Sequence, residues 1–575
     1  MKDKQSYSLK KRFLYTGMVF VIFLALAEIF LQVFGFVQVF EPFECNDLGS
    51  GARECRYTLN RDTPPFQAPK PEGTTRVVVI GGSAANGWPF EGAGFTGTIK
   101  VVLERHPSCE VIKLAVNGIN TDVAKEILKE ALVLLEPDVV VIYAGNNELL
   151  GHEYFNDLQH PRLKATAWWL RKNSTLWNIP SNIANEALSR GLAVEMMIKI
   201  SKMEEENGQW LFTENERRKA KKLYLYHMEQ MIRLCRKNDA VPVICTPASN
   251  LKEWVPMKSV HTRDLSQKKR DEIEKTVKEA RKMIRSGKSA KAAATLLKVT
   301  KEDPDYAKAW FFLGKALYKS GRKSESVRFF EEAVEKADFH QQTPPSWNRD
   351  LRNLADGFSV TLADTDMHMR EVSDTLPGFE YFLDGCHPTL EGHRLIASHI
   401  LQEMADAGII LSEGEDLRIP SLESLTVLNQ AGKLKLGIQL FNQAALLAFL
   451  VRPPEYYPVA SRYMKESMEL GFNVSVAETY RGYLSILDGN PGEAARQFTR
   501  AKKEDPAVFG AVLRNNFSHA VTMRGNTFDV KVLSDENLPV LYPNVKQEPL
   551  PSSAKGGPVY RFVWKDREYV FKALK

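Results

Sequence analysis

The stretch VVVIGGS, residues 77–83, decides the fold of this chain. Four consecutive β-branched residues that run into two glycines are typical of a central parallel strand, because such a strand is buried on both faces. Three later stretches repeat the form, namely EVIKLAV (110–116), DVVVIYAG (138–145) and VPVICTP (241–247), and TDVAKEILKEALVLLE (121–136) predicts an amphipathic helix between two of them. Strands that alternate with helices predict an α/β fold with a doubly wound parallel sheet.

Polar residues and glycines follow the predicted strands, at the edge where open α/β sheets bind ligands. The groups are Gly81-Gly82-Ser83, Asn117-Gly118, Gly145-Asn146-Asn147-Glu148 and, far downstream, Asp384-Gly385-Cys386-His387-Pro388. A serine hydroxyl is a poor nucleophile until a base takes its proton, and His387 is the candidate base for Ser83. Asp384 lies three residues before His387, so one turn brings its carboxylate to the other ring nitrogen. The sequence thus predicts a Ser83–His387–Asp384 triad, with Pro388 at the first position of a helix.

These four groups, taken in order, resemble the four sequence blocks of the SGNH (GDSL-like) hydrolase family over residues 74–260 and 340–408. The resemblance implies an oxyanion hole formed by the backbone N–H groups of Ser83 and Gly118 and by the side chain of Asn147. Donors in these places would stabilise the negative oxygen of a tetrahedral intermediate. The family's usual first block is Gly-Asp-Ser, and here Gly82 stands in place of the aspartate.

Each of these residues also has a purely structural interpretation. Ser83 could cap a helix, Gly118 could serve a turn and Asn147 could bond a loop backbone. A nucleotide-binding loop is disfavoured, because neither G-x-G-x-x-G nor a Walker lysine is present. We assign His393 a structural role and Cys386 a packing role. The joint occurrence of the four groups in the expected order favours the hydrolase.

A second pattern begins after residue 268. Gly287 and Gly321 each lie in Ser-Gly-Lys/Arg and are 34 residues apart, which is the period of a tetratricopeptide repeat. The resemblance to that family's consensus is carried by Trp310, Leu313, Gly314, Phe330 and Ala333, and near the C-terminus by Gly482, Gly489, Ala494, Phe498, Ala501 and Pro506. We expect these positions to pack helical hairpins together, and a protein partner to bind polar positions of the repeats. We also expect the inserted pair to fold independently of the sheet.

The N-terminus carries five Lys or Arg residues in its first twelve positions and then the apolar segment 13–40, which is long enough to cross a membrane. This charge distribution predicts a cytoplasmic N-terminus, a transmembrane helix and an extracytoplasmic, periplasmic or cell-surface remainder. A cleaved signal peptide with a site near Ala25–Ala27 is the alternative. In an oxidising compartment Cys45 and Cys55 could form a disulfide, or they could remain two free thiols.

Composition excludes several classes of function. The 575 residues carry 77 Lys and Arg against 71 Asp and Glu, a net charge of +6 that lies mostly at the N-terminus, which argues against a nucleic-acid partner. Six cysteines with no C-x-x-C or H-E-x-x-H spacing suggest no metal site, and we expect no cofactor.

The predicted organisation has a helical insert at about 150–235 within the hydrolase domain. The whole chain divides into the following predicted segments: a cytoplasmic tail (1–12), a transmembrane helix (13–40), a linker (41–73), the N-terminal segment of the hydrolase domain (74–268), the repeat insert (269–339), the C-terminal segment of the hydrolase domain (340–410), a second linker (411–430), tetratricopeptide-like repeats (431–515) and a β-rich tail (516–575). We expect a membrane-anchored serine esterase that acts on an acylated substrate, with O-acyl groups on a carbohydrate or envelope polymer as the candidate. Two alternatives stay open: an O-acyltransferase that uses the same triad, and a non-catalytic repeat scaffold with a degenerate hydrolase domain.

Overall fold

The computed structural model describes most of the chain from residue 42 onward. The described ranges are 42–49, 51–60, 62–148, 214–256, 259–337, 342–409, 418–419, 430–448, 454–488, 490–512, 527–529, 559–564 and 567–574. The expected transmembrane segment, most of the expected helical insert and most of the second expected linker lie outside these ranges. Within them, no helix combines the length and apolar character needed to cross a membrane.

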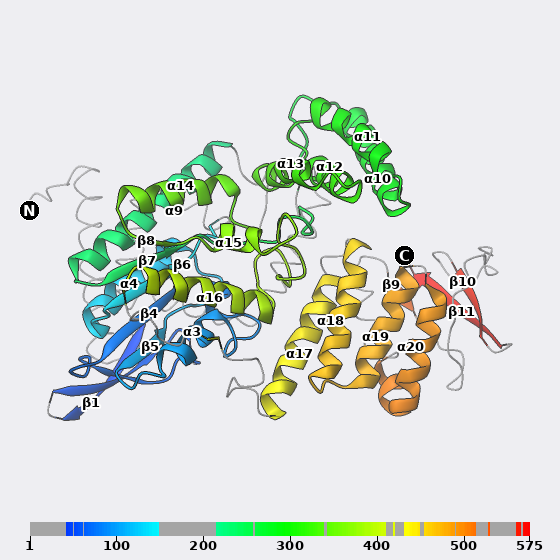
Figure 1. Cartoon of the computed structure of the whole chain (residues 1–575). Helices are drawn as coiled ribbons and strands as arrows, with labels where there is room; N and C mark the ends of the chain where they lie inside the picture. The colour runs from blue at the N-terminus through cyan, green and yellow to red at the C-terminus, as the bar shows by residue number, and fades with distance from the viewer. Residues whose placement is uncertain are drawn as a thin grey trace, which may run out of the picture.

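A five-stranded parallel sheet forms the centre of the α/β domain, at the left of Figure 1. Its spatial order is β5 (Cys109–Lys113), β4 (Thr75–Gly81), β6 (Val139–Tyr143), β7 (Val241–Cys245) and β8 (Thr361–Ala363). The four strands expected from the sequence are all present, and β4, which contains the decisive stretch, lies between β5 and β6. The edge strand β8 was not predicted, because three residues are too few to show a pattern. Because the four expected strands pair in parallel, the predicted parallel sheet is confirmed.

Helices cover both faces of this sheet, because successive strand residues point to opposite sides. Val78, Ile80, Val140 and Ile142 pack against α4 (Thr121–Leu135), α9 (Glu214–Lys237) and α14 (Pro345–Gly357). On the other face Val77, Val79, Val139 and Val141 pack against α3 (Phe95–Leu103), α15 (Thr365–Glu371) and α16 (Leu390–Asp406). The predicted helix 121–136 is thus α4, while Pro388 lies outside α16, which begins at Leu390 with Thr389 as its side-chain cap. Pro388 instead forms a β-bridge with Phe382.

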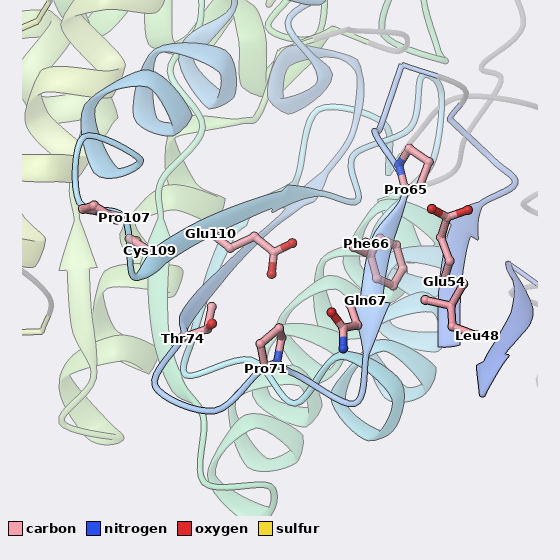
Figure 2. Close-up of a pocket in the computed structure, with 10 residues that line it drawn as sticks. All are labelled: Leu48, Glu54, Pro65, Phe66, Gln67, Pro71, Thr74, Pro107, Cys109 and Glu110. Atoms are coloured by element: carbon pink, nitrogen blue, oxygen red, sulfur yellow. The ribbon is translucent and has the colours of Figure 1, made fainter. Parts of the chain in front are cut away.

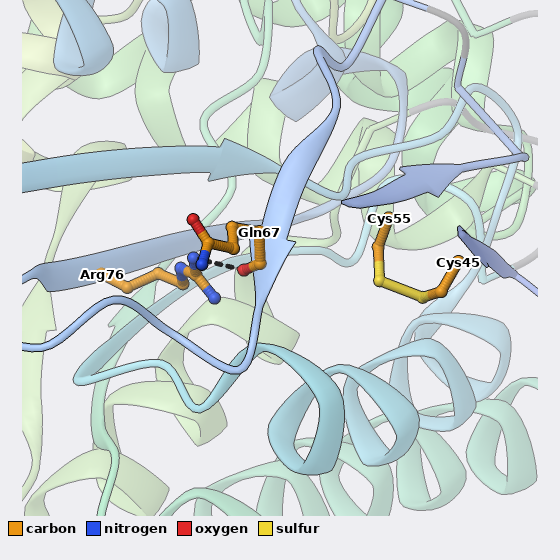
Figure 3. Close-up of a disulfide and its surroundings, with 4 residues drawn as sticks. All are labelled: Cys45, Cys55, Gln67 and Arg76. Atoms are coloured by element: carbon orange, nitrogen blue, oxygen red, sulfur yellow. Dashed lines mark hydrogen bonds between the residues drawn. A yellow bond between two sulfur atoms is a disulfide. The ribbon is translucent and has the colours of Figure 1, made fainter. Parts of the chain in front are cut away.

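The segment expected to be a linker, 41–73, contains an antiparallel sheet of its own. It comprises β1 (Phe43–Gly49), β2 (Ala52–Tyr57) and β3 (Phe66–Ala68), and a Cys45–Cys55 disulfide joins the first two strands (Figure 3). Buried Arg76 fastens this sheet to the large one, since it donates to Gln67 O over 2.9 Å and to Leu135 O over 2.7 Å. The linker was inferred from the Pro-rich, polar residues 60–75, which contain β3. β1 and β2 gave no clear strand signal, because most of their side chains face solvent.

Two helical units follow in the chain. The first is α10 (Gln267–Arg285), α11 (Ser289–Glu302), α12 (Ala307–Lys319) and α13 (Lys323–Lys336); the second is α17 (Gln430–Leu446), the short 3₁₀ helix η2 (Pro454–Tyr456), α18 (Tyr457–Glu469), α19 (Val474–Leu487) and α20 (Pro491–Glu504). The tail adds a small antiparallel sheet of β9 (Thr527–Asp529), β10 (Val559–Trp564) and β11 (Arg567–Leu574).

The inserted helices pack against other parts of the chain. A single apolar core joins them to the second helical unit and to loop residues Trp254, Phe379 and Leu383 of the sheet domain. Arg281 of α10 also pairs with Glu455 of the second unit over 2.7 Å. The 34-residue period describes packing within the repeats and says nothing about their outer surface, so it did not predict this shared core. Independent folding of the insert stays a prediction.

A pocket of about 370 Å³ lies at the amino-terminal edge of the sheet, among Glu54, Phe66, Thr74, Cys109 and Glu110 (Figure 2). This pocket lies where β4 and β5 begin, whereas Ser83 follows the end of β4. The chemistry expected from the sequence belongs to that opposite, carboxyl edge.

Candidate active site

Ser83 is presented at the carboxyl end of the central strand. It is the first residue of the one-turn helix α2 (Ser83–Asn86), which begins directly after β4 and Gly82. Gly81 has no room for a side chain, because a Cβ there would lie 1.9 Å from Tyr143 O of the adjacent strand. This close approach of the two strands is possible because residue 81 is glycine. Ser83 itself is 9% exposed.

Asp384 and His387 lie in one tight loop between α15 and α16. Asp384 Oδ1 accepts the backbone N–H groups of Cys386 at 2.9 Å and His387 at 2.8 Å. Leu383 N donates to His387 O over 2.7 Å and closes the loop from the other side. These bonds place both side chains on the same side of the loop, as the D-x-x-H spacing predicted.

The three residues form a continuous line of hydrogen bonds. His387 Nδ1 lies 2.7 Å from Asp384 Oδ2, and His387 Nε2 lies 2.7 Å from Ser83 Oγ. A carboxylate only accepts, so Nδ1 carries a hydrogen; in the neutral ring, Nε2 then accepts from the serine hydroxyl. The structure therefore brings Ser83, Asp384 and His387 together in the order that nucleophile activation requires.

Electrostatics favours an ionised acid beside the ring. Burial alone would raise the pKa of Asp384, but the facing His387 and the hydrogen bonds from His387 and Cys386 outweigh it and hold this pKa below its usual value. Burial alone would lower the pKa of His387, but the charge of Asp384 outweighs it and raises this pKa well above the ordinary value. The carboxylate thus supports the imidazolium that forms when the ring takes a proton.

Trp88 is a member of the site that the sequence did not reveal. Its ring centroid lies 4.4 Å from that of His387, with the two planes tilted by 54°. Such a contact contributes about 1 kcal/mol and fixes the plane of the imidazole. The signal in the sequence is an aromatic residue shortly after the serine, but spacing alone does not show that its ring turns back onto a histidine some 300 positions away.

The residues expected to form the oxyanion hole come from three neighbouring strand ends. Asn147, after β6, donates through Nδ2 to Ile119 O over 2.9 Å, in the loop that contains Gly118. Gly118 adopts a φ of +79°, which favours glycine. A Cβ on Gly82 would lie only 2.7 Å from Asn147 Nδ2. The glycine that departs from the Gly-Asp-Ser block therefore makes room for the asparagine beside Ser83.

An asparagine network supports this loop and was also missed. Asn86 Nδ2 donates to Asn117 Oδ1 over 3.0 Å, and Asn60 Nδ2 lies 2.8 Å from Asn86 Oδ1 and 2.9 Å from Ala115 O. Asn60 belongs to the segment that the sequence led us to regard as a linker. Its role has no local signature, because it depends on how the N-terminal sheet packs.

His393 and Cys386 have the structural surroundings that we expected. His393 is fully buried and its Nδ1 accepts from Phe95 N over 3.2 Å; burial lowers its pKa to about 3. Cys386 Sγ lies 3.8 Å from His387 Nδ1. Ligand atoms of Asp384, Cys386 and His387 lie within 4.8 Å of one another, as a metal site would require. Burial raises the pKa of the Cys386 thiol, which disfavours the thiolate that would bind a metal.

A family model confirms the inserted repeats. The tetratricopeptide repeat model matches residues 277–340. No curated protein sequence matches the chain.

Several solved structures are similar to a portion of the chain. A GDSL-like lipase from Bacteroides thetaiotaomicron is 12% identical, with a TM-score of 0.26 over 58% of this chain and 89% of the other. A putative acylhydrolase from Bacteroides fragilis is 13% identical, with a TM-score of 0.28 over 59% and 91%. An acetylxylan esterase from Geobacillus stearothermophilus is 11% identical, with a TM-score of 0.27 over 60% and 97%. Values this low carry no inference about activity, which has to rest on the geometry above.

Proposed function

We propose that this chain is a serine hydrolase of the SGNH type that cleaves an ester through an acyl-serine intermediate. The observation that carries the proposal is the line Ser83 Oγ–His387 Nε2 and His387 Nδ1–Asp384 Oδ2, with 2.7 Å at each step. A helix-capping role for Ser83 explains neither bond, because capping requires a backbone N–H partner.

The chemistry follows from these positions. Ser83 Oγ attacks the ester carbonyl carbon while His387 Nε2 takes the hydroxyl proton, and the carbonyl π electrons move to the oxygen. Collapse of the tetrahedral intermediate breaks the bond to the leaving alcohol, which receives the proton from Nε2. Water then attacks the acyl-serine by the same route, releases the carboxylic acid and restores the Ser83 hydroxyl.

The oxyanion would be held by the Ser83 and Gly118 backbone N–H groups and by Asn147. The Asn147 amide nitrogen has two hydrogens, one of which is directed to Ile119 O. Its second hydrogen is the donor that the proposal requires. Each donor of this kind is worth about 3 kcal/mol in the transition state.

The proposal extends to substrate and location. An O-acyl group on a carbohydrate or envelope polymer is the substrate class we propose, with residues 13–40 anchoring the enzyme outside the cytoplasmic membrane and the tetratricopeptide repeats binding a protein. The basic first twelve residues and the apolar segment after them motivate the location. Protease added to cells with a permeable outer layer should digest the chain beyond residue 41, and a protected C-terminus would contradict this topology.

Labelling with a fluorophosphonate tests the activity itself. The full chain should form a covalent adduct at Ser83 and hydrolyse p-nitrophenyl acetate, whereas Ser83→Ala should do neither. Exposed Ser324, on α13, gives the control Ser324→Ala, which should label and turn over like the unchanged chain. A folded wild-type protein that is not labelled would favour the non-catalytic scaffold. Transfer of the acyl group to an added sugar in preference to water would favour the acyltransferase.

A further inference from the structure

Gln443 of the second helical unit contacts the triad residue Asp384. This side chain, on α17, is 2% exposed, and its Nε2 lies 3.3 Å from Asp384 Oδ2 and 3.5 Å from Leu383 O. Gln443 follows Asp384 by 59 residues and belongs to a different folding unit. The acid of the triad is therefore contacted by a helix that lies outside the sheet domain.

The same helical unit holds the backbone around this loop. Tyr463 OH lies 2.8 Å from Phe382 O and 3.1 Å from Phe379 O, and Arg462 donates to Phe379 O over 2.7 Å. Tyr456 OH accepts from Val255 N over 2.8 Å. Three side chains of η2 and α18 thus hold the backbone just before the triad acid, at Phe379 and Phe382, and the loop after β7, at Val255.

The orientation of the Gln443 amide argues for a role in positioning the acid. Both nearby atoms, Asp384 Oδ2 and Leu383 O, are acceptors, so the NH₂ group has to face them. This leaves Gln443 Oε1 buried without a hydrogen-bond partner in the described part of the chain. An unsatisfied buried carbonyl is destabilising, and an apolar side chain of similar volume would avoid it. The benefit that offsets this cost is the N–H donor supplied to Asp384.

A neutral donor suits this carboxylate. Asp384 is almost fully buried, and its remaining partners are two backbone N–H groups on Oδ1 and the His387 ring on Oδ2. A Lys or Arg in place of the glutamine would compete with the imidazolium for the negative charge. The amide holds Oδ2 in place and leaves that charge for His387.

We propose that Gln443 is a positioning residue for the triad, so that the second helical unit completes the active site. The inference rests on the proposed function and names a further residue on which that function depends. It also explains why the sheet domain and this unit share one apolar core around Trp254, Phe379 and Tyr456.

Three variants of the full chain test the proposal. Gln443→Leu removes the donor together with the unsatisfied Oε1, so it should stay folded yet lose about tenfold in kcat/KM on p-nitrophenyl acetate, at every pH tested. Gln443→Glu has the same shape and donates only while it is protonated, and the neighbouring Asp384 charge raises the pKa of the introduced carboxyl. Gln439→Leu makes the same chemical change one turn earlier on α17 and should leave kcat/KM unchanged.

The pH dependence separates positioning from a structural role. The ratio of kcat/KM for Gln443→Glu to that of the wild type should be close to one at the acidic end and fall as pH rises, as the introduced proton is lost. Circular dichroism at each pH confirms that the variant is folded. If both Gln443 variants keep wild-type kcat/KM at all pH values, this inference alone is overturned. A folded wild-type chain that neither labels nor turns over ester overturns the proposed function, and this inference with it.

Discussion

His387 Nε2 lies 2.7 Å from Ser83 Oγ although 304 positions of sequence separate the two residues. Ser83 follows the central strand, whereas His387 comes after the whole repeat insert and after the edge strand β8. The insert therefore leaves and re-enters the sheet domain without separating the serine from its base. It also packs against the loop that leads to Asp384, because Tyr318 OH donates to Asp374 of that loop over 3.0 Å. Lys315 Nζ lies 3.4 Å from Glu253, which in turn accepts from Phe379 N of the same loop over 2.8 Å.

Ester hydrolysis should depend on pH through His387. The neutral ring is the base, and Asp384 raises its pKa well above the ordinary value, so kcat/KM should rise with pH with a midpoint above about 6.5. Turnover of p-nitrophenyl acetate measured across this range gives the midpoint. His387→Ala should abolish the rise, and a variant that kept full activity would refute the assignment of the base.

Asp384→Asn should preserve the loop but impair catalysis. An amide can still accept from the Cys386 and His387 backbone, yet it carries no charge to support the imidazolium and does not enforce the tautomer. We expect kcat to fall roughly 10³- to 10⁴-fold, the size of effect seen when a triad acid is neutralised. Asp374→Asn is the matched control, since that carboxylate lies in the same loop and is 59% exposed. Equal activities of the two variants would contradict the role of Asp384.

Gly82→Ala should lower activity through Asn147. The added Cβ would lie 2.7 Å from Asn147 Nδ2, so the asparagine has to move away from Ser83. We expect a loss of about tenfold to a hundredfold in kcat, because displacing one oxyanion donor should cost less than removing it, which costs about 10²- to 10³-fold. Gly357→Ala, in exposed helical backbone with no atom within 4 Å of the new Cβ, should have wild-type kinetics. A fully active Gly82→Ala variant would indicate that Asn147 has no part in catalysis.

His393 should make the fold sensitive to acid. Its pKa is lowered to about 3, so the folded state holds the neutral ring. A depressed histidine pKa contributes stability that is fully present above the unfolded value of about 6.5 and is lost as pH falls below it. Between pH 7 and pH 5 the free energy of unfolding should fall by about 2 kcal/mol through this group.

Urea unfolding of His393→Asn checks this expectation. The variant should lose less stability than the wild type over the same pH interval, because asparagine does not titrate. An identical acid response in wild type and His393→Asn would show that His393 is not the responsible group.

The central strands and the Asp384–His387 pair could be predicted because their signals are local, whereas the pairing of Ser83 with His387 was predicted from the order of the four strand-end groups, which resembles that of a known family. Buried parallel strands have continuous apolar runs, as at 77–80, and the D-x-x-H spacing of Asp384 and His387 is closed by bonds within four residues. A 34-residue period likewise records how one helical hairpin packs on the next. These patterns appear in the sequence because each one is produced by neighbours along the chain.

Only the tertiary structure decided which distant residues complete the site. Trp88 on His387, Gln443 on Asp384 and Asn60 on Asn86 are contacts between separate elements, and none leaves a period or a spacing in the sequence. The same holds for the packing of both helical units onto the loop before Asp384. Periodicity indicates which face of a helix or strand is buried, but long-range packing decides which residues from other elements cover that face.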